Sequence, residues 1–138
     1  ICLILASSGV NAQSKNGAKS IISAKAEVKS YHSQTELQAM QKGELIELYV
    51  ERINVLVKIL PYIALTTNQG VTITDLGIPN DSKNRKVMEE QSKAISDFIE
   101  KTNNFQRKIT PYSDTNSLIA SILFYENTLK AVHELESL

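Results

Sequence analysis

The chain has 138 residues, the length of one domain, and its 15 basic and 15 acidic side chains leave a formal net charge of zero. A neutral chain has no overall field to attract nucleic acid or an anionic membrane, so we expect no nucleic-acid partner. Aromatic residues make up 6% of the chain, Trp is absent, and Gly and Pro number only 5 and 3. This shortage of strand-forming and turn-forming residues predicts an all-α fold.

The first twelve residues have the pattern of the end of a signal peptide. An uncharged apolar run leads to Val10-Asn11-Ala12, with small residues where a signal peptidase requires them. We expect residues 1–12 to be the C-terminal part of a cleaved signal peptide and residues 13–17 to be a flexible leader; a retained N-terminal anchor is the alternative. The ending Asn11-Ala12-Gln13 resembles that of exported proteins of the Bacteroidetes type, which implies a periplasmic or secreted protein of a Gram-negative bacterium.

Cys2 is the one cysteine of the chain, and it lies within the expected signal peptide. The mature chain would therefore have no disulfide, so burial of apolar side chains must provide its stability even in an oxidising compartment. A chain of this size buries roughly two thirds of its unfolded surface, which is enough for one core. We expect residues 18–138 to form a single helical-bundle domain with no stable membrane insertion after cleavage.

The stretch 18–32 carries a thin apolar stripe at helical spacing, and it predicts a first helix. Serine and alanine interrupt the stripe, so this helix should be the least stable of the set. Its apolar face would consist of Ile21, Ala24, Val28 and Tyr31.

A capping box should start the next element, a short turn of helix over 35–41. Ser33 with Glu36, or Thr35 with Gln38, has the required spacing, in which side chains satisfy the free backbone N–H groups of a helix start. Gly43 then allows a bend or break before the following helix, since glycine costs up to about 1 kcal/mol in a helix interior.

Residues 45–65 carry apolar side chains around most of a helical wheel, and we expect this stretch to be the central helix. The apolar arc is much wider than the roughly 100° of an ordinary surface helix, so neighbours must cover it on more than one side. Pro61 removes a backbone hydrogen bond, so the helix should kink or end near Leu60. The two stripes are Ile46, Tyr49, Ile53, Leu56, Leu60 and Ile63, and Leu45, Leu48, Val55 and Ile59.

Arg52 falls within the apolar arc of the central helix. One interpretation is that its stem is buried while its charged end reaches water. The other is a buried ion pair, for which Glu126 on the last helix is the best acid because it lies in line with apolar residues of that helix. Our hypothesis is that Arg52 and Glu126 touch, and that the contact fixes the register of the two helices.

Residues 66–82 form an unusually long connection, and apolar side chains are interleaved with its Gly and Pro residues. We expect this loop to be ordered and to fold over one end of the bundle as a plug. Long ordered loops also carry binding sites, so a ligand or partner surface is the alternative. The candidate interaction residues are Val71, Ile73, Asp75, Leu76 and Ile78.

Two more helices complete an antiparallel up-down bundle of three long helices, with the weaker N-terminal helix beside them. The stop signal at Pro79 starts a helix over 82–109, which should bury one face, and Pro111 ends it. A final helix over 115–135 should bury Leu118, Ile122, Tyr125, Leu129 and Val132. The buried face of the helix before it would be Met88, Ile95, Phe98, Phe105 and Ile109.

The sequence has no motif of a phosphate-binding loop, a dinucleotide fold, a zinc protease or a nucleophile elbow. The only catalytic group that can be drawn is His32 with Ser113 and Asp114, and helix capping explains the last two more simply. We therefore expect no catalytic residues, no metal site and no cofactor. Two function classes remain: an exported helical module that binds a protein partner, which we favour, and a small-ligand binder or enzyme with a pocket between loop 66–82 and the helix ends. The oligomeric state is not predicted.

Overall fold

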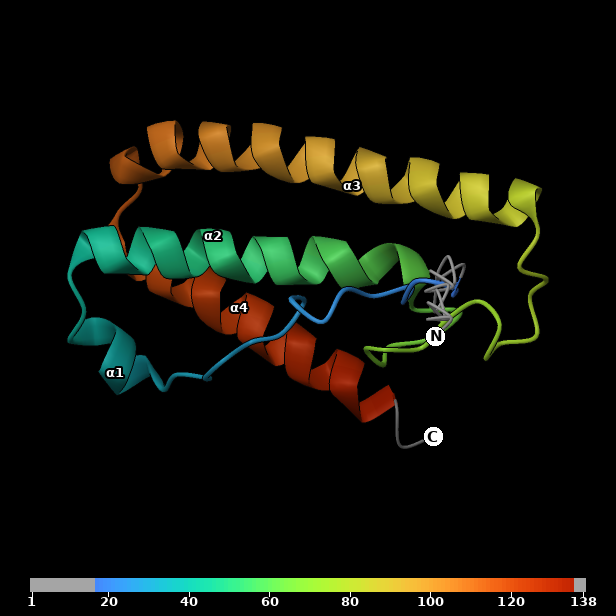
Figure 1. Cartoon of the computed structure of the whole chain (residues 1–138). Helices are drawn as coiled ribbons and strands as arrows, with labels where there is room; N and C mark the ends of the chain where they lie inside the picture. Colours follow the sequence, from blue (N-terminus) through green and yellow to red (C-terminus); the bar gives the residue numbers. More distant parts are fainter. Residues whose placement is uncertain (1–16, 136–138) are drawn as a thin grey trace, which may run out of the picture.

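The computed structural model describes residues 17–135, and every regular element in that range is helical (Figure 1). The expected signal peptide over 1–12 and all but the last residue of the leader lie outside the described residues. The α-helices are α1 (Gln34–Gln38), α2 (Lys42–Ile59), α3 (Ser82–Ile109) and α4 (Thr115–Glu134), and 3-10 turns follow α2 and α3 at Leu60–Tyr62 and Thr110–Tyr112.

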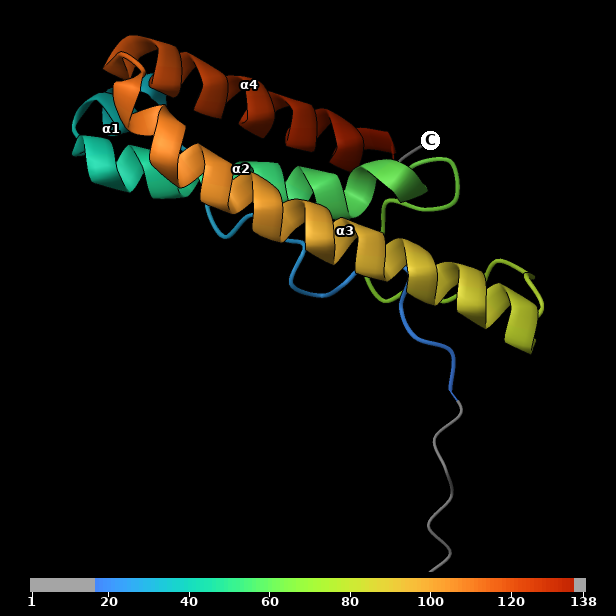
Figure 2. The same cartoon turned by 90° about the horizontal axis from the view of Figure 1, so that it is seen from above.

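Helix α2 is the centre of the bundle. Helices α3 and α4 both pack against it, and they approach it from different sides (Figures 1 and 2). Helices α2, α3 and α4 alternate in direction along the chain, so the predicted all-α antiparallel bundle of three long helices is confirmed, and the short helix α1 precedes them. The buried residues of α2 are Leu45, Ile46, Val50, Arg52, Ile53, Val55, Leu56 and Ile59.

Proline and aspartate set the ends of the long helices. α2 ends at Ile59, and Pro61 lies in the 3-10 turn that follows, as its missing N–H requires. The side chain of Asp81 accepts the backbone N–H of Asn84 and starts α3. The side chain of Asp114 caps α4 in the same way. The predicted bounds of α3 and α4 therefore hold to within one residue.

The prediction of a helix over 18–32 is wrong. Residues 17–32, which we call the N-terminal arm, run without a regular element along the bundle, and the sole β-bridge of the described residues joins Ser20 to Thr72. The hydroxyl and carbonyl of Ser23 take the backbone N–H groups of Lys25 and Ala26, which replaces helical hydrogen bonding there. The residues that the arm buries are Ile21, Ile22, Ala26 and Val28.

The short helix forms where a capping box predicts it. Ser33 and Glu36 make both reciprocal hydrogen bonds at the start of α1, which covers Gln34–Gln38 rather than 35–41. The break before α2 falls at residues 39–41, so the prediction that Gly43 allows the break is wrong. Gly43 lies inside the first turn of α2. In the same turn, the carboxylate of Glu44 accepts the backbone N–H of Gln41.

Helix α3 buries far less of its surface than its apolar residues predict. All 28 of its residues belong to the described part of the chain, and none of them is buried. Phe98, Phe105 and Ile109, expected in the core, are 52%, 56% and 50% exposed, so that prediction is wrong. Met88 and Ile95 of the predicted face are half-buried, as is Ile99, because α3 faces α2 with a side about one quarter turn further round its axis.

The core consists of two clusters along α2. The larger joins the N-terminal arm to the second half of α2, to the loop residue Ile73 and to Leu129 and Val132 of α4. The smaller joins Leu37 of α1 to the first half of α2 and the first half of α4. No helix within residues 17–135 is both long and apolar enough to cross a membrane.

Candidate functional site

Arg52 and Glu126 lie in direct contact between α2 and α4. The Nε and Nη2 atoms of Arg52 donate to Oε1 of Glu126 at 3.0 and 2.8 Å. Arg52 is 1% exposed and Glu126 is 0% exposed, so the interpretation in which Arg52 extends its charged end into water is wrong. A charge so deeply buried requires a partner, and each of these residues is the partner of the other.

The same pair fastens the end of the N-terminal arm. Nη2 of Arg52 donates to the carbonyl of Ser30 at 2.6 Å, and the backbone N–H of His32 donates to Oε2 of Glu126 at 2.8 Å. Nδ1 of His32 lies 3.1 Å from Oε1 of Glu126 and 3.3 Å from Nη2 of Arg52. We call Arg52, Glu126, Ser30 and His32 the clasp, because two side chains of the helices hold two residues of the arm.

The electrostatics of the clasp favour the charged form of Glu126. Burial raises the pKa of its carboxyl, but hydrogen bonds from the His32 backbone and from Arg52 outweigh that effect and leave the pKa below its usual value. Burial raises the pKa of the Tyr31 hydroxyl, which lies beside the clasp and has no hydrogen-bond partner among the described residues. Both oxygens of Glu126 are engaged, so the clasp serves to position the arm.

The catalytic group drawn from the sequence does not form. His32 belongs to the clasp and its ring contacts Glu126, whereas the carboxylate of Asp114 accepts the backbone N–H and the hydroxyl of Ser117. These hydrogen bonds hold the pKa of Asp114 below its usual value, as expected of a helix cap. Within residues 17–135, no three His, Cys, Asp or Glu side chains are grouped as a metal site would need.

Loop 66–82 packs against the N-terminal arm at the end of the bundle. Ile73 is 4% exposed, Val71 and Ile78 are half-buried, and the carbonyl of Val71 accepts the backbone N–H of Ile21. Asp75 faces outward and its carboxylate accepts the N–H and hydroxyl of Thr72. Gly77 has a φ of +74°, a conformation that glycine allows at low cost, and it ends this turn.

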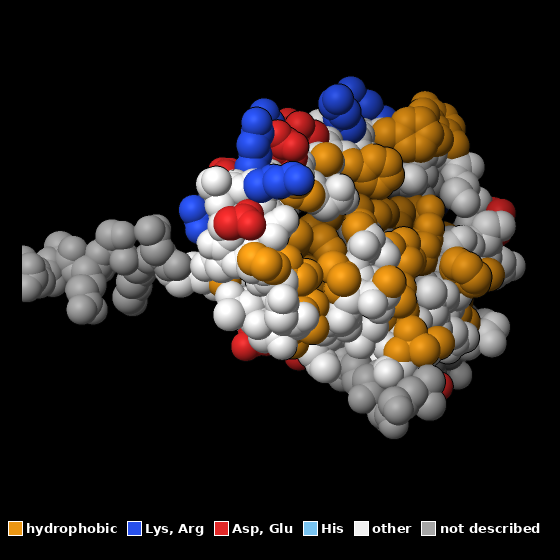
Figure 3. Space-filling view, turned by 90° about the vertical axis from the view of Figure 1, so that its right-hand side faces the viewer, with side chains coloured by type: hydrophobic (Ala, Val, Ile, Leu, Met, Phe, Trp, Pro, Cys, Tyr) orange, Lys and Arg blue, Asp and Glu red, His pale blue; other side chains and the backbone are white. Residues whose placement is uncertain are grey.

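The loop covers the end of the bundle only in part. Figure 3 looks onto that end and shows apolar side chains gathered over the middle of the face. Leu60, Leu65 and Leu76 are 47%, 45% and 38% exposed. These leucines therefore leave apolar surface exposed at this end of the bundle.

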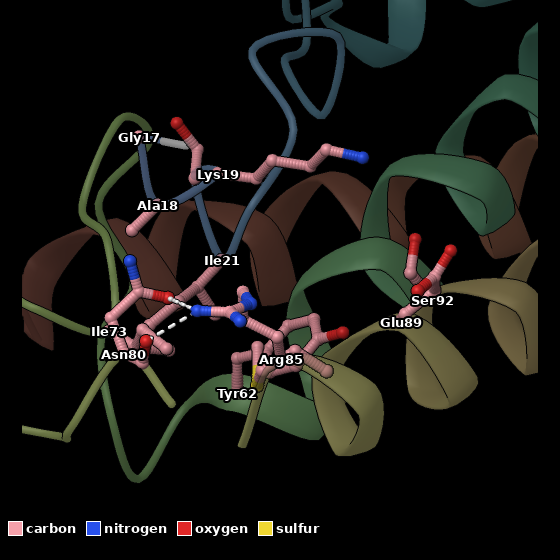
Figure 4. Close-up of a pocket in the computed structure, with 12 residues that line it drawn as sticks. Gly17, Ala18, Lys19, Ile21, Tyr62, Ile73, Asn80, Arg85, Glu89 and Ser92 are labelled. Carbon is pink, nitrogen blue, oxygen red and sulfur yellow. Dashed lines mark hydrogen bonds between the residues drawn. The ribbon is translucent and has the colours of Figure 1, made fainter. Parts of the chain in front are cut away.

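A cavity of about 280 Å³ lies where the arm, the loop and the start of α3 meet. Its apolar wall is made by Ile21 of the arm, Tyr62 after α2 and Ile73 of the loop, all of which belong to the larger core cluster. Figure 4 shows the guanidinium of Arg85 extended toward Asn80 beside this wall, with Lys19 on the arm side. The other lining residues are Gly17, Ala18, Ser20, Met88, Glu89 and Ser92.

This cavity lies between the loop and the helix ends, where the second function class places a pocket. Of the loop residues named from the sequence, Ile73 lines it, and Val71, Asp75, Leu76 and Ile78 do not. Sequence reasoning missed Arg85 and Tyr62. Tyr62 follows the end of α2 and Arg85 lies at the start of α3, so the whole loop separates them along the chain. The one available signal was the stop at Pro79, since it places the first turn of α3, and with it Arg85, at the end of the loop.

A second feature of the surface is a row of exposed apolar side chains on α3. Val87, Phe98, Phe105 and Ile109, which we call the α3 stripe, are 57%, 52%, 56% and 50% exposed. At about 100° per residue their directions fall within a narrow arc of the helix, beside the face that packs on α2. Phe98, Phe105 and Ile109 follow one another closely enough on this arc to form a patch, and Val87 lies about 16 Å further toward the start of α3.

Helix α4 carries an exposed aromatic ring of its own. Phe124 is 64% exposed and its ring meets that of Tyr125 edge-on, with centroids 5.5 Å apart. The ring of Tyr125 lies 5.7 Å from that of Tyr49 on α2.

No family model matches this sequence, and comparison with curated proteins and with solved structures finds no match either.

Proposed function

We propose that this protein is an exported, non-catalytic helical bundle that binds a protein partner through the α3 stripe. One observation carries the proposal: a 28-residue helix has no buried residue and turns two phenylalanines toward water. Exposed apolar patches of this kind mark interaction sites on soluble proteins. Support for export comes from the signal-like ending at Val10-Asn11-Ala12.

The partner that fits the stripe is an amphipathic helix with an acidic flank. Phe98 and Phe105 are seven residues apart, so their rings lie about 10 Å apart along α3, which matches apolar residues two turns apart on a docking helix. Lys101 and Lys108 follow the two phenylalanines at a spacing of three and are exposed. Neither lysine has an ion pair within residues 17–135, so acidic side chains on a partner would complement them.

Three variants of the full chain test the proposal by capture from an envelope extract of the source organism. Phe98→Glu with Phe105→Glu should abolish capture of the partner, and Lys101→Glu with Lys108→Glu should weaken it at low salt. Asn104→Glu is the control for added charge, because it places a negative charge on the same helix outside the stripe, and it should leave capture unchanged. Capture that survives the phenylalanine substitutions would refute the proposal.

The second candidate function is the binding of a small ligand, and the cavity lined by Arg85 is the observation in its favour. Ligand sites combine an apolar wall with a few convergent polar groups, and this cavity has both. Its volume of about 280 Å³ is near the lower end for such sites, so the ligand must be small.

A further inference from the structure

The cavity between the arm, the loop and α3 presents apolar side chains on its inner wall. Ile21, Tyr62 and Ile73 are 7%, 6% and 4% exposed, and Met88 of α3 packs against the same core cluster. The wall is therefore part of the core, and the chain's own side chains leave only a small area of it open to the cavity. An apolar ligand body would complete its packing, since each methylene removed from water contributes favourably to binding.

Arg85 provides the polar end of the cavity. Its Nη1 atom donates to the carbonyl of Asn80 at 2.5 Å and lies 3.5 Å from the Asn80 side-chain oxygen. Its other nitrogens have no hydrogen-bond partner among the described residues, although a guanidinium carries five donors. Glu89 is four residues along the same helix, the ideal place for an ion pair, but Arg85 turns toward Asn80 instead (Figure 4).

The charges around the cavity favour an anion. Arg85 and Lys19 are positive and Glu89 is negative, so the lining has one net positive charge. Figure 4 places Glu89 and Ser92 apart from the group formed by Arg85, Asn80 and Ile73. Arg85 also lies in the first turn of α3, where the helix dipole adds to the attraction for negative charge.

We propose that this cavity binds a small monocarboxylate with an apolar body, whose carboxylate pairs with Arg85 while its chain lies on Ile21, Tyr62, Ile73 and Met88. Arg recognises carboxylates through two parallel hydrogen bonds, and the free nitrogens of Arg85 can supply them. A volume of about 280 Å³ corresponds to roughly nine water molecules at ~30 Å³ each, which is the size of a carboxylate with about ten non-hydrogen atoms. None of the α3 stripe residues lines the cavity, so this site is independent of partner binding.

The test is an NMR titration of the full chain with sodium octanoate, which has the required size and charge. Octanol is the matched probe, because it has the same apolar body without the carboxylate. Octanoate should saturate one site with a Kd below about 1 mM and should shift the methyl signals of Ile73 and Met88. Octanol should bind at least about tenfold more weakly, because it cannot pair with the guanidinium.

Two charge variants locate the interaction. Arg85→Gln should weaken octanoate binding at least about tenfold and leave octanol binding unchanged. Lys83→Gln removes the same charge from the same helical turn outside the cavity, and it should change neither Kd by more than about twofold. Ala18→Trp fills the cavity from the arm and should abolish binding of both probes, with the spectrum confirming that the bundle remains folded.

Three results would overturn the inference. One is an octanoate titration that does not saturate by about 5 mM. Another is binding that Arg85→Gln leaves unchanged, and the third is a shift pattern centred on Phe98 and Phe105 rather than on Ile73 and Met88. The last result would place the ligand on the α3 stripe and leave the proposed partner surface open to its own capture test.

Discussion

Arg52 and Glu126 are 1% and 0% exposed, and together they hold the carbonyl of Ser30 and the backbone N–H of His32. Taking two charges into a core costs more than an apolar pair of the same volume would. What the pair provides here is position, because four groups from α2, α4 and the arm must meet for all of them to be satisfied. The clasp thus explains how an arm without helical hydrogen bonds keeps one path along the bundle.

Removing Glu126 should leave the buried charge of Arg52 with only the exposed carboxylate of Glu51, 3.3 Å from its Nη1 atom. Removing Arg52 should leave the carboxylate of Glu126 buried without a cationic arginine. We expect Glu126→Leu to lower the free energy of unfolding by about 3–5 kcal/mol. The double variant Arg52→Met with Glu126→Leu should lose less than the sum of the two single variants by about 2 kcal/mol or more, because no unpaired charge remains. Urea unfolding at pH 7 measures all three losses, and strictly additive losses would show that the pair is not coupled.

The low pKa of Glu126 also predicts how stability depends on pH. A carboxyl whose pKa is lowered in the folded state stabilises it above the unfolded pKa, about 4.3 for Glu, and this contribution is lost as pH falls through the folded pKa. Glu126→Gln lacks the contribution, so its free energy of unfolding should lie below that of the wild type at pH 7. The gap should shrink below about pH 4.3.

Urea unfolding of both chains between pH 7 and pH 3 checks this prediction. The lowered pKa values of the capping carboxyls Glu36 and Asp114 act equally in both proteins, so they cancel in the comparison. A gap that stays constant over the whole pH range would mean that Glu126 is not charged in the folded protein.

The elements of the bundle differ in how firmly they are held. Helix α2 buries eight of its residues, whereas α3 buries none and is joined to α2 near its end by an exposed pair, Glu47 and Arg107. The guanidinium and carboxylate of that pair make two hydrogen bonds, at 3.0 and 2.9 Å. Exposed ion pairs add little to stability because water and salt screen them, so α3 should open without unfolding of the rest.

Hydrogen exchange distinguishes the two helices. Backbone amides over residues 50–56 of α2 should exchange only when the whole protein unfolds, and those over 96–104 of α3 should exchange at least about tenfold faster. Native-state exchange followed by NMR gives both rates in one sample. Equal protection of the two stretches would mean that α3 belongs to the core.

The arm should contribute to the core as a helix does, although it is not one. Ile22 is 0% exposed, so Ile22→Ala should cost about 2–4 kcal/mol. An exposed residue of the same arm gives the control, because Glu27→Ala should stay within about 0.5 kcal/mol. Thermal and urea unfolding measure both, and a loss below about 1 kcal/mol for Ile22→Ala would show that the arm is not packed in solution.

The helix bounds could be predicted from the sequence because local residues set them: Pro61 and Pro111 end two helices, and Asp81 and Asp114 start two. The path of the arm could not be predicted, because Ile21 and Ile22 are buried by residues of α2, the loop and α4 that are distant in the sequence. The contact of Arg52 with Glu126 was accessible, because each is a charge within an apolar face. A pocket at this end of the bundle was only the alternative interpretation, and its lining could not be predicted, because Tyr62 and Arg85 meet only in the folded chain.

As a whole, the molecule separates two surfaces. One end carries the cavity lined by the arm, the loop and the start of α3, and the length of α3 carries the stripe. The arm and α4 cover α2 where the core is dense, and α3 covers it with half-buried residues. This division gives a stable pair of helices that supports a third whose apolar side chains remain available to a partner.

Urea unfolding of the Phe98→Glu, Phe105→Glu double variant measures whether these rings belong to a partner surface or to the core. Both rings are about half exposed, so the two substitutions together should lower the free energy of unfolding by less than about 2 kcal/mol. A loss of about 6 kcal/mol or more, the cost of removing two buried phenylalanines, would contradict this assignment and place the rings in the interior of the protein.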